Sequence, residues 1–284
     1  MFITEDFYMN SKNNNSLCSK APENSDKYGK CGKYGNLGLV SVSFRQLSPE
    51  RIAELVSECG LSGVEWGADV HCRPDSAESA QKVCGLSEKC GIKCFAYGSY
   101  YRAGTPEQSE FEFEKVLEAA KSIHAPIVRV WAYVKGSDEA TKDEYLSCAA
   151  DLKRICALAK KENIIVSLEC HNNTFTDNYK SALALLDDVA CDNLTMYWQP
   201  NQFKDLAYNI QSAAALAPYT TNVHVFNWSG KDKMPLSGAV DTWKRYVSEL
   251  EKGNRAHNYL LEFMPCGTPE ELPAEVVALK EIFS

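Results

Sequence analysis

The sequence has few of the features that mark nucleic-acid-binding and membrane proteins. Its 284 residues include 30 Lys and Arg against 38 Asp and Glu, with no basic cluster to follow a phosphate backbone. No apolar run approaches the roughly 20 residues of a membrane span. Residues 1–6 lack the basic and apolar regions of a signal peptide. We therefore expect a cytoplasmic protein that binds neither nucleic acid nor a membrane.

A paired cysteine motif for structural zinc is also missing, although the chain has 12 cysteines. The closest pair, Cys90 and Cys94, has no second pair to complete a site. In a chain without an export signal, cysteines are usually reduced and buried as small apolar residues. We expect that state here, in preference to disulfides or a zinc site.

Periodic apolar residues are scarce in residues 1–36, which are rich in Asn, Ser, Lys and Gly. The glycines at 29, 32, 35 and 38 do not form a dinucleotide-binding loop, because no strand precedes them and no helix follows. We predict a loosely ordered N-terminal extension over residues 1–36 and one domain over residues 37–284. The length would also suit two small domains.

From residue 39 onward, short apolar runs alternate with amphipathic segments, an order that favours one domain. Helix-start patterns lie between the runs: Ser48 before Pro49, and capping boxes that begin at Thr105 and Thr141. Later helices are predicted near residues 181–189, 203–216, 239–251 and 273–283. The runs predicted as strands are residues 39–44, 63–66, 93–97, 127–131, 164–168, 194–198, 222–226 and 259–263.

Eight strands that alternate with helices predict an α/β fold, a closed (β/α)₈ TIM barrel, with an open doubly wound sheet as the alternative. Three of the strands end in polar side chains: Glu169, His224 and Glu262. A barrel brings the carboxyl ends of its strands to one mouth, which an open sheet does less readily. The sequence therefore predicts a site where these three side chains meet.

The chain from about residue 39 to the C-terminus resembles the sugar phosphate isomerase/epimerase group of xylose isomerase-like barrels. That group includes ketose 3-epimerases, hydroxypyruvate isomerase and inosose dehydratase. The resemblance rests on four pieces that occur in order: GVEWG at 63–67 with His71, LECH at 168–171, HVF at 224–226 and LE at 261–262. It specifies the superfamily and leaves the individual member open.

The resemblance implies a divalent metal held by Glu, Asp, His and Glu from the last four strands. Carried over to this sequence, the ligands are Glu169, His224 and Glu262, with Gln199 where the family has Asp. Gln offers a carbonyl oxygen and no charge, so Mn²⁺ or Mg²⁺ would be held more weakly, and Zn²⁺ is the other candidate.

The resemblance also implies a metal-dependent isomerase or epimerase that acts on a sugar or cyclitol through an enediolate. Glu169 and Glu262 are the expected acid and base, because they would flank the carbon that loses its proton. Aromatic side chains such as Tyr100 and Trp228 offer faces for a sugar ring. The expected substrate contacts, all at or just past strand ends, are Glu65, His71, Arg129, Trp131, His171 and Asn227.

Two other functions stay open on the same barrel: a metal-dependent dehydratase or other lyase, and a barrel that binds a sugar without turnover. Endonuclease IV-type DNA repair is discounted, because 5 His residues are few for three zinc ions. Arg45 and Arg102 are candidate phosphate contacts, but no glycine-rich helix start follows the last strands, so a non-phosphorylated substrate is favoured. The expected partner is a small sugar or cyclitol, and self-association into a homo-oligomer is left open.

Overall fold

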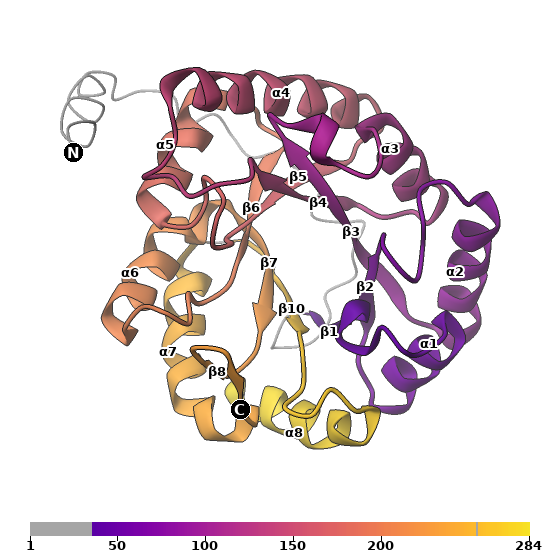
Figure 1. Ribbon diagram of the computed structural model, residues 1–284. Helices are drawn as coiled ribbons and strands as arrows, with labels where there is room; N and C mark the ends of the chain where they lie inside the picture. Colours follow the sequence, from indigo (N-terminus) through magenta and orange to yellow (C-terminus); the bar gives the residue numbers. More distant parts are fainter. Residues whose placement is uncertain (1–35, 254) are drawn as a thin grey trace. The chain divides into compact units, whose positions relative to one another are not determined.

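The structure, a computed structural model, describes residues 36–253 and 255–284. The predicted extension lies outside these residues except for Asn36, which begins the first strand. Eight parallel strands of the described part form a closed barrel (Figure 1). In chain order they are β1 (Asn36–Val40), β2 (Gly63–Gly67), β3 (Lys93–Ala103), β4 (Ile127–Ala132), β5 (Ile165–Glu169), β6 (Leu194–Trp198), β7 (Thr220–Val225) and β10 (Asn258–Leu261).

Helices lie outside the barrel between successive strands (Figure 1). They are α1 (Pro49–Glu58), α2 (Ala77–Cys90), α3 (Phe113–Ser122), α4 (Lys142–Lys161), α5 (Tyr179–Val189), α6 (Leu206–Leu216), α7 (Val240–Leu250) and α8 (Leu272–Ile282). A two-stranded antiparallel hairpin, β8 (Trp228–Ser229) with β9 (Asp232–Lys233), follows β7. The pairing of β1 with both β2 and β10 closes the barrel, which confirms the predicted (β/α)₈ fold and excludes the open sheet.

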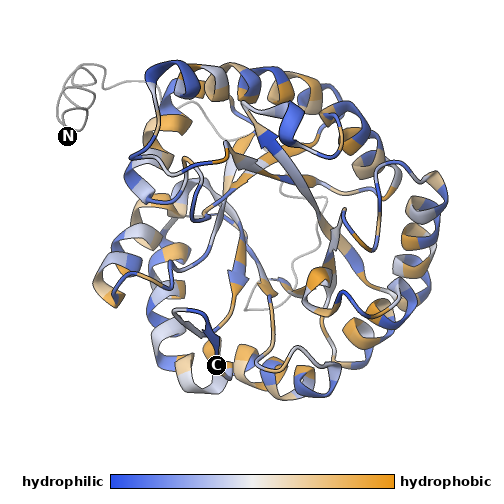
Figure 2. Ribbon diagram, viewed as in Figure 1, coloured by the Kyte–Doolittle hydropathy of each residue, from blue (hydrophilic) through white to orange (hydrophobic). Residues whose placement is uncertain are grey.

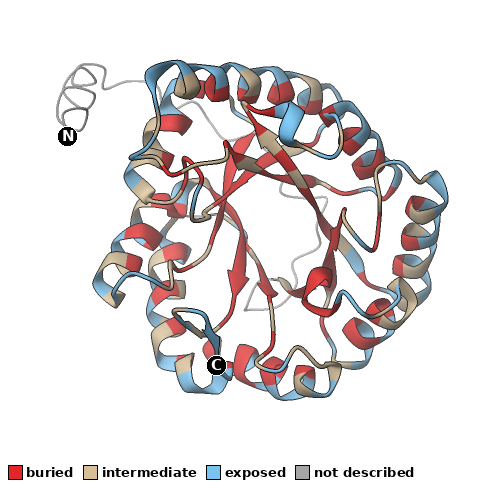
Figure 3. Ribbon diagram, in the orientation of Figure 1, coloured by how far each residue is buried: buried red, intermediate tan, exposed pale blue. Residues whose placement is uncertain are grey.

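The main core lies between the barrel and its helices. Apolar and buried positions follow the barrel-facing side of each helix (Figures 2 and 3). A smaller apolar cluster fills the inside of the barrel around Phe95. Two glycines make room for the Phe95 ring, because a Cβ at Gly38 or Gly63 would lie within 2.8 Å of a ring atom. Within the described part of the chain, no helix is long and apolar enough to cross a membrane.

Several sequence-based boundaries were wrong. The strand predicted over residues 93–97 continues to Ala103. Residues 41–44, predicted as the end of the first strand, form a 3₁₀ helix, η1 (Ser41–Phe44). The Thr105 side chain makes no cap hydrogen bond and precedes only a short 3₁₀ turn, while α3 begins at Phe113. Helix α6 begins three residues later than predicted, because Asp205 caps it by accepting a hydrogen bond from the Tyr208 N–H.

The helix starts at Ser48 and Thr141 are confirmed. Ser48 accepts a hydrogen bond from the Arg51 N–H, and Thr141 forms a reciprocal capping box with Glu144. Because the strands are parallel, the last residues of all of them lie at the same mouth of the barrel.

Candidate metal centre and active site

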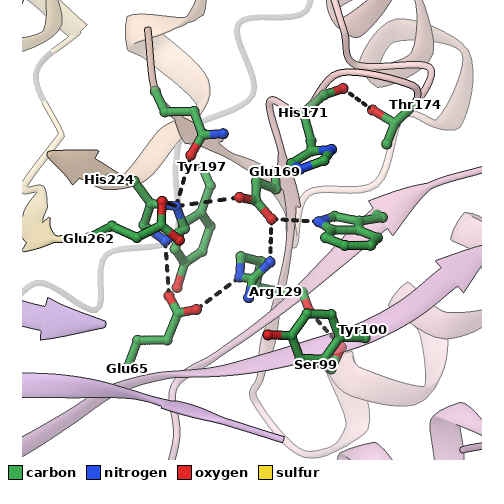
Figure 4. Close-up of polar contacts among 12 residues, drawn as sticks. Glu65, Ser99, Tyr100, Arg129, Glu169, His171, Thr174, Tyr197, His224 and Glu262 are labelled. Carbon is green, nitrogen blue, oxygen red and sulfur yellow. Dashed lines mark hydrogen bonds and ion pairs between the residues drawn. The ribbon is translucent and has the colours of Figure 1, made fainter. Parts of the chain in front are cut away.

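Four strands deliver side chains to one point at the mouth of the barrel. Glu169 is the last residue of β5, His224 lies near the end of β7, and Gln199 and Glu262 directly follow β6 and β10. The Nδ1 atom of His224 lies 2.9 Å from Gln199 Oε1 and 3.4 Å from Glu169 Oε1. It lies 3.5 Å from Glu262 Oε2. The structure thus brings together the residues predicted as metal ligands, of which Figure 4 labels Glu169, His224 and Glu262.

This donor set fits a divalent cation. Glu169, His224 and Glu262 each offer a ligand atom, and these atoms all lie within 4.8 Å of one another in a buried group. An imidazole nitrogen has one N–H at most, so Nδ1 of His224 can satisfy only one of the three oxygens around it. A cation at this point would satisfy all of them, and carboxylate, carbonyl and imidazole ligands suit Mn²⁺, Mg²⁺ or Zn²⁺.

The carboxylates around His224 also favour positive charge on its imidazole. Burial by itself lowers the pKa of His224, but Glu262, Glu169 and Glu65 together raise it to about 10. The histidine therefore holds two protons near neutral pH when no metal competes. A metal ion that binds to Nδ1 must displace one of these protons.

A buried arginine sets the position of two glutamates beneath the site. Arg129, on β4, donates from Nε to Glu65 Oε1 at 2.8 Å and from an Nη to Glu169 Oε2. The arginine is 3% exposed and Glu65 is fully buried. Burial by itself disfavours charge on all three groups, but the ion pairs lower the pKa of Glu65 and of Glu169 and raise that of Arg129.

Glu65 also contacts the far side of the histidine. Its Oε2 lies 3.4 Å from His224 Nε2. A carboxylate can only accept, so this contact places a proton on Nε2 and leaves Nδ1 toward the ligand oxygens. The Tyr197 ring packs edge-on against His224 with centroids 5.1 Å apart, which limits rotation of the imidazole.

The two predicted catalytic glutamates have different surroundings. Glu169 Oε2 accepts hydrogen bonds from both Arg129 and the Trp131 indole N–H. Glu262 has no comparable donor among the described residues, and burial raises its pKa against the opposing effect of His224. Glu262 is therefore the better proton acceptor of the two, while Glu169 is held as a charged ligand.

A cavity of about 230 Å³ opens above these residues. Its lining includes the predicted ligands Glu169, Gln199 and Glu262. It also includes three of the predicted substrate contacts, Arg129, Trp131 and His171. The His171 ring stacks on Trp131 with centroids 4.8 Å apart. Its Nδ1 lies 2.7 Å from the Asn172 carbonyl oxygen, which only accepts, so Nδ1 carries a proton and donates it there.

Three of the predicted substrate contacts do not line this cavity. Glu65 lies beneath it, as described, and His71 is 1% exposed, with its ring nitrogens against the Ser41 hydroxyl and the Leu47 carbonyl. Asn227 lines a neighbouring cavity and donates to the Pro235 carbonyl. Their roles as substrate contacts stay predictions that this arrangement does not favour.

Other cavity residues were not identified as contacts from the sequence. Phe226 and Phe263 form apolar walls, and Gln202 lies at the edge. Phe226 and Phe263 follow the ends of β7 and β10, so the strand-end rule that selected Asn227 could have found them. Gln202 lies in a loop whose path the sequence does not specify.

Comparisons with known proteins agree with this fold. Residues 53–280 match the family model described as xylose isomerase-like TIM barrel. A 3-dehydroshikimate dehydratase from Bacillus anthracis is 25% identical over 211 residues, which cover 68% of this chain and 72% of that protein.

Two solved structures share the barrel. A probable 3-DHS dehydratase involved in petrobactin synthesis, also from Bacillus anthracis, superposes with a TM-score of 0.72 at 20% identity, over 86% of this chain and 98% of the other. A 3-keto-D-glucoside 4-epimerase from E. coli superposes with a TM-score of 0.66 at 11% identity, over 86% and 98%. At these identities the structural likeness shows the fold alone.

Proposed function

Because this chain belongs to the xylose isomerase-like TIM barrel family, we propose that it is a metal-dependent isomerase or epimerase of a sugar or cyclitol. The observation that carries the proposal is the convergence of Gln199, Glu169 and Glu262 oxygens on one nitrogen of His224. A divalent metal held there would act as a Lewis acid toward the oxygens of a hydroxyketone.

The residues of the chain supply the proton transfer. Glu262 lines the cavity and has a raised pKa, so it is the group that takes a proton from the carbon beside the carbonyl. The resulting enediolate is reprotonated in one of two ways. In an isomerase, Glu262 returns the proton to the neighbouring carbon while the hydroxyl proton of the substrate moves to the former carbonyl oxygen. In an epimerase, Glu169 starts protonated and gives its proton to the opposite face.

The surroundings of Glu169 favour the first of these routes. Its Oε2 already accepts two hydrogen bonds, one from a buried arginine, and these oppose protonation. Epimerisation would require Glu169 to give up a proton from its other oxygen, Oε1, which faces His224.

A dehydratase is the second candidate, and His171 is the observation that favours it. His171 lines the cavity and uses its Nδ1 proton for the Asn172 carbonyl, so Nε2 is the ring nitrogen that remains for proton transfer. It can take the proton next to the carbonyl and deliver the same proton to a β-hydroxyl, which leaves as water when its C–O bond breaks. No other reactant is needed, and a relative in the comparisons is named as a dehydratase.

Proton NMR in D₂O separates these functions. The Mn²⁺-loaded protein is incubated with a panel of ketoses, inososes and cyclic β-hydroxyketones. Deuterium uptake beside the carbonyl with every hydroxyl retained supports the isomerase or epimerase. Loss of water with a new enone absorbance supports the dehydratase. If neither exchange nor water loss occurs with any compound, both proposals are wrong.

A further inference from the structure

One corner of the cavity above the metal centre presents hydrogen-bond donors that serve none of the predicted metal ligands. The corner consists of Arg45, which follows η1, and Tyr100, on β3, and both residues line the cavity. Among the described contacts, neither side chain forms a hydrogen bond or an ion pair with a predicted ligand. Both therefore remain available to a substrate when the centre holds a cation.

The hydroxyl group of Tyr100 is left as a donor. Nη2 of Arg45 donates to Tyr100 Oη at 2.7 Å, and no residue of the described part accepts the hydroxyl proton. Burial raises the pKa of Tyr100 to about 12, against the opposing effects of Arg129 and Arg45, so the proton stays on the oxygen at neutral pH. The ring lies beside Arg129 (Figure 4), whose Cζ is 5.7 Å from its centroid, and packs edge-on against Trp131. These contacts fix the donor in place.

Arg45 also has N–H groups to spare. A guanidinium has five N–H groups. Three of them are used: Nε donates to Asp69 Oδ2 at 3.0 Å, Nη1 to the Val42 carbonyl at 3.2 Å, and Nη2 to Tyr100. These contacts orient the guanidinium, and its other N–H groups have no partner in the described part of the chain. The side chain is 44% exposed, so a ligand can reach it.

Donors without a matching acceptor favour an anionic group. A sugar hydroxyl both donates and accepts, whereas the oxygens of a carboxylate or a phosphate dianion only accept. The Val42 carbonyl already accepts from Arg45, and Asp69 is not part of the cavity lining. The carboxylates of the lining, Glu169 and Glu262, belong to the metal centre. A negatively charged acceptor is therefore the complement of this corner.

A second cation lies against the same wall residue as Arg45. Phe263 lines the cavity, and its ring centroid is 6.0 Å from Arg45 Cζ and 4.6 Å from Lys233 Nζ. Lys233 is exposed and has no carboxylate partner among the described residues. The backbone of Phe263 has a φ of 55°, which is unusual for a bulky residue, and its N–H donates to the Ser43 hydroxyl. This conformation keeps the ring beside both cations, whose charge attracts an anion.

We propose that Arg45 and Tyr100 form an anion-binding subsite, so that the substrate is a ketose or cyclic hydroxyketone that carries a carboxylate or a phosphate. The carbonyl and its neighbouring hydroxyl face the metal centre, and the anionic group accepts hydrogen bonds from the corner. Both regions line one cavity, so one molecule can occupy them together. This inference rests on the proposed function and names the substrate class. Side chains supply the donors, so no helix start is needed to hold the anion.

Isothermal titration calorimetry of the Mn²⁺-loaded full chain tests the proposal with three ketoses that differ only at carbon 6. Fructose has a hydroxyl group there, fructuronate a carboxylate, and fructose 6-phosphate a phosphate ester. At least one anionic compound is expected to bind about tenfold more tightly than fructose, because it accepts charge-assisted hydrogen bonds. The tighter of the two identifies the anionic group as a carboxylate or a phosphate.

Two variants locate the gain in affinity. Arg45→Gln removes the charge and should bring the affinity ratio of anionic compound to fructose down to about one. Tyr100→Phe keeps the ring and removes the hydroxyl, which should lower the ratio about threefold. Arg102→Gln is the matched control and should keep the ratio, because Arg102 lies over Trp131 at 4.4 Å but does not line the cavity. Thermal melts show whether each variant is folded, as expected for a partly exposed ion pair between Arg45 and Asp69.

Anionic compounds that bind no more tightly than fructose, or a gain that survives Arg45→Gln, would overturn the proposal. A test without any variant is the addition of about 0.5 M NaCl to the wild type, which should remove most of the gain. A gain unchanged by salt would also overturn it. Deuterium exchange into the same compounds tests the reaction separately. A gain that Arg45→Gln removes, without exchange in any compound, would support the subsite and count against the isomerase alone.

Discussion

At the scale of single residues, the two glutamates of the site differ in their ion-pair and hydrogen-bond partners. Glu169 balances the charge of a buried arginine, whereas Glu262 faces only His224, at 3.5 Å, and burial raises its pKa. The sequence placed both at strand ends and gave them equal roles. Their difference arises from Arg129, which lies 40 residues before Glu169 in the chain, and only the closed barrel brings the two together.

Glu262→Gln should lower turnover about 10²–10⁴-fold, because the group proposed to take the proton is removed. The fold should survive, since Glu65 and Glu169 still face His224 when Glu262 loses its charge. Glu169→Gln should also abolish turnover but lower the stability by about 3–5 kcal/mol, because Arg129 loses half of its buried charge compensation. Deuterium exchange and urea unfolding measure the two effects. Wild-type exchange in Glu262→Gln would contradict the assignment of the base.

Gln199→Asp should tighten the binding of Mn²⁺, because a carboxylate replaces a neutral carbonyl 2.9 Å from His224 Nδ1. Turnover should change as well, since a cation with more negative ligands is a weaker Lewis acid. The measurement is calorimetric titration of Mn²⁺ into chelator-treated protein, with Gln202→Glu as the control for an added charge at the cavity edge. Equal affinities in wild type and Gln199→Asp would mean that residue 199 is not a ligand.

At the scale of elements, one capping-box prediction was confirmed and one was wrong. Thr141 caps α4, but the Thr105 hydroxyl is buried without a partner. Thr141→Val should therefore lower the free energy of unfolding by about 1 kcal/mol. Thr105→Val, which replaces an unpaired hydroxyl with a methyl group, should be neutral or stabilising. Urea denaturation of both variants is the test, and an equal loss in the two would show that the cap contributes nothing specific.

The contact between α8 and the loop before α7 should make stability depend on pH. Glu275 is 8% exposed and accepts a hydrogen bond from the Leu236 N–H at 3.1 Å. Burial raises its pKa from the ordinary value of 4.5, against the effect of that hydrogen bond. The folded protein then binds this proton more tightly than the unfolded chain does. The favourable contribution is present below pH 4.5 and is lost as the pH rises through the folded pKa.

Glu275→Gln should consequently gain stability relative to wild type as the pH rises from 4.5 to neutral, because the variant has no proton to lose at this position. Melting temperatures measured across that range, with Glu281→Gln on the exposed side of α8 as the control, show the trend. A difference between wild type and Glu275→Gln that stays constant with pH would contradict it.

The sequence predicted the elements better than their ends, for physical reasons. Alternating apolar runs and helix caps are local signals, and they identified all eight strands of the barrel. The turn at Ser41 depends on a distant partner, because its hydroxyl accepts a hydrogen bond from the Gly67 N–H on β2. The placement of His71 depends on that same hydroxyl. No local pattern reports contacts of this kind. Strand-end positions therefore led to Arg129, Trp131 and His171, which line the cavity, but also to His71, which does not.

At the scale of the whole molecule, the barrel closes through residues that the structure describes. Strand β1 pairs with β10 from Asn36 onward and with β2 from Gly38 onward. We predict that removing the residues before Asn36 leaves the cooperative melt and Mn²⁺ binding largely intact, because residues 1–35 lack a periodic apolar pattern. Calorimetry of the shortened and full chains compares both properties. Aggregation, or loss of the single transition, would show that the segment is part of the fold.

The closing of β1 onto β10 also determines when the site can exist during folding. Asn36 and Asn258, which pair across this seam, are 222 residues apart in sequence, and joining such distant segments carries a large loop-closure entropy. Glu262 follows the strand that completes the seam, so no earlier intermediate has all four ligands. If the proposed centre binds a metal, Mn²⁺ added during refolding should bind in the slowest kinetic phase. On the ribosome all four of these side chains could hold a cation only after the last strand has been synthesised.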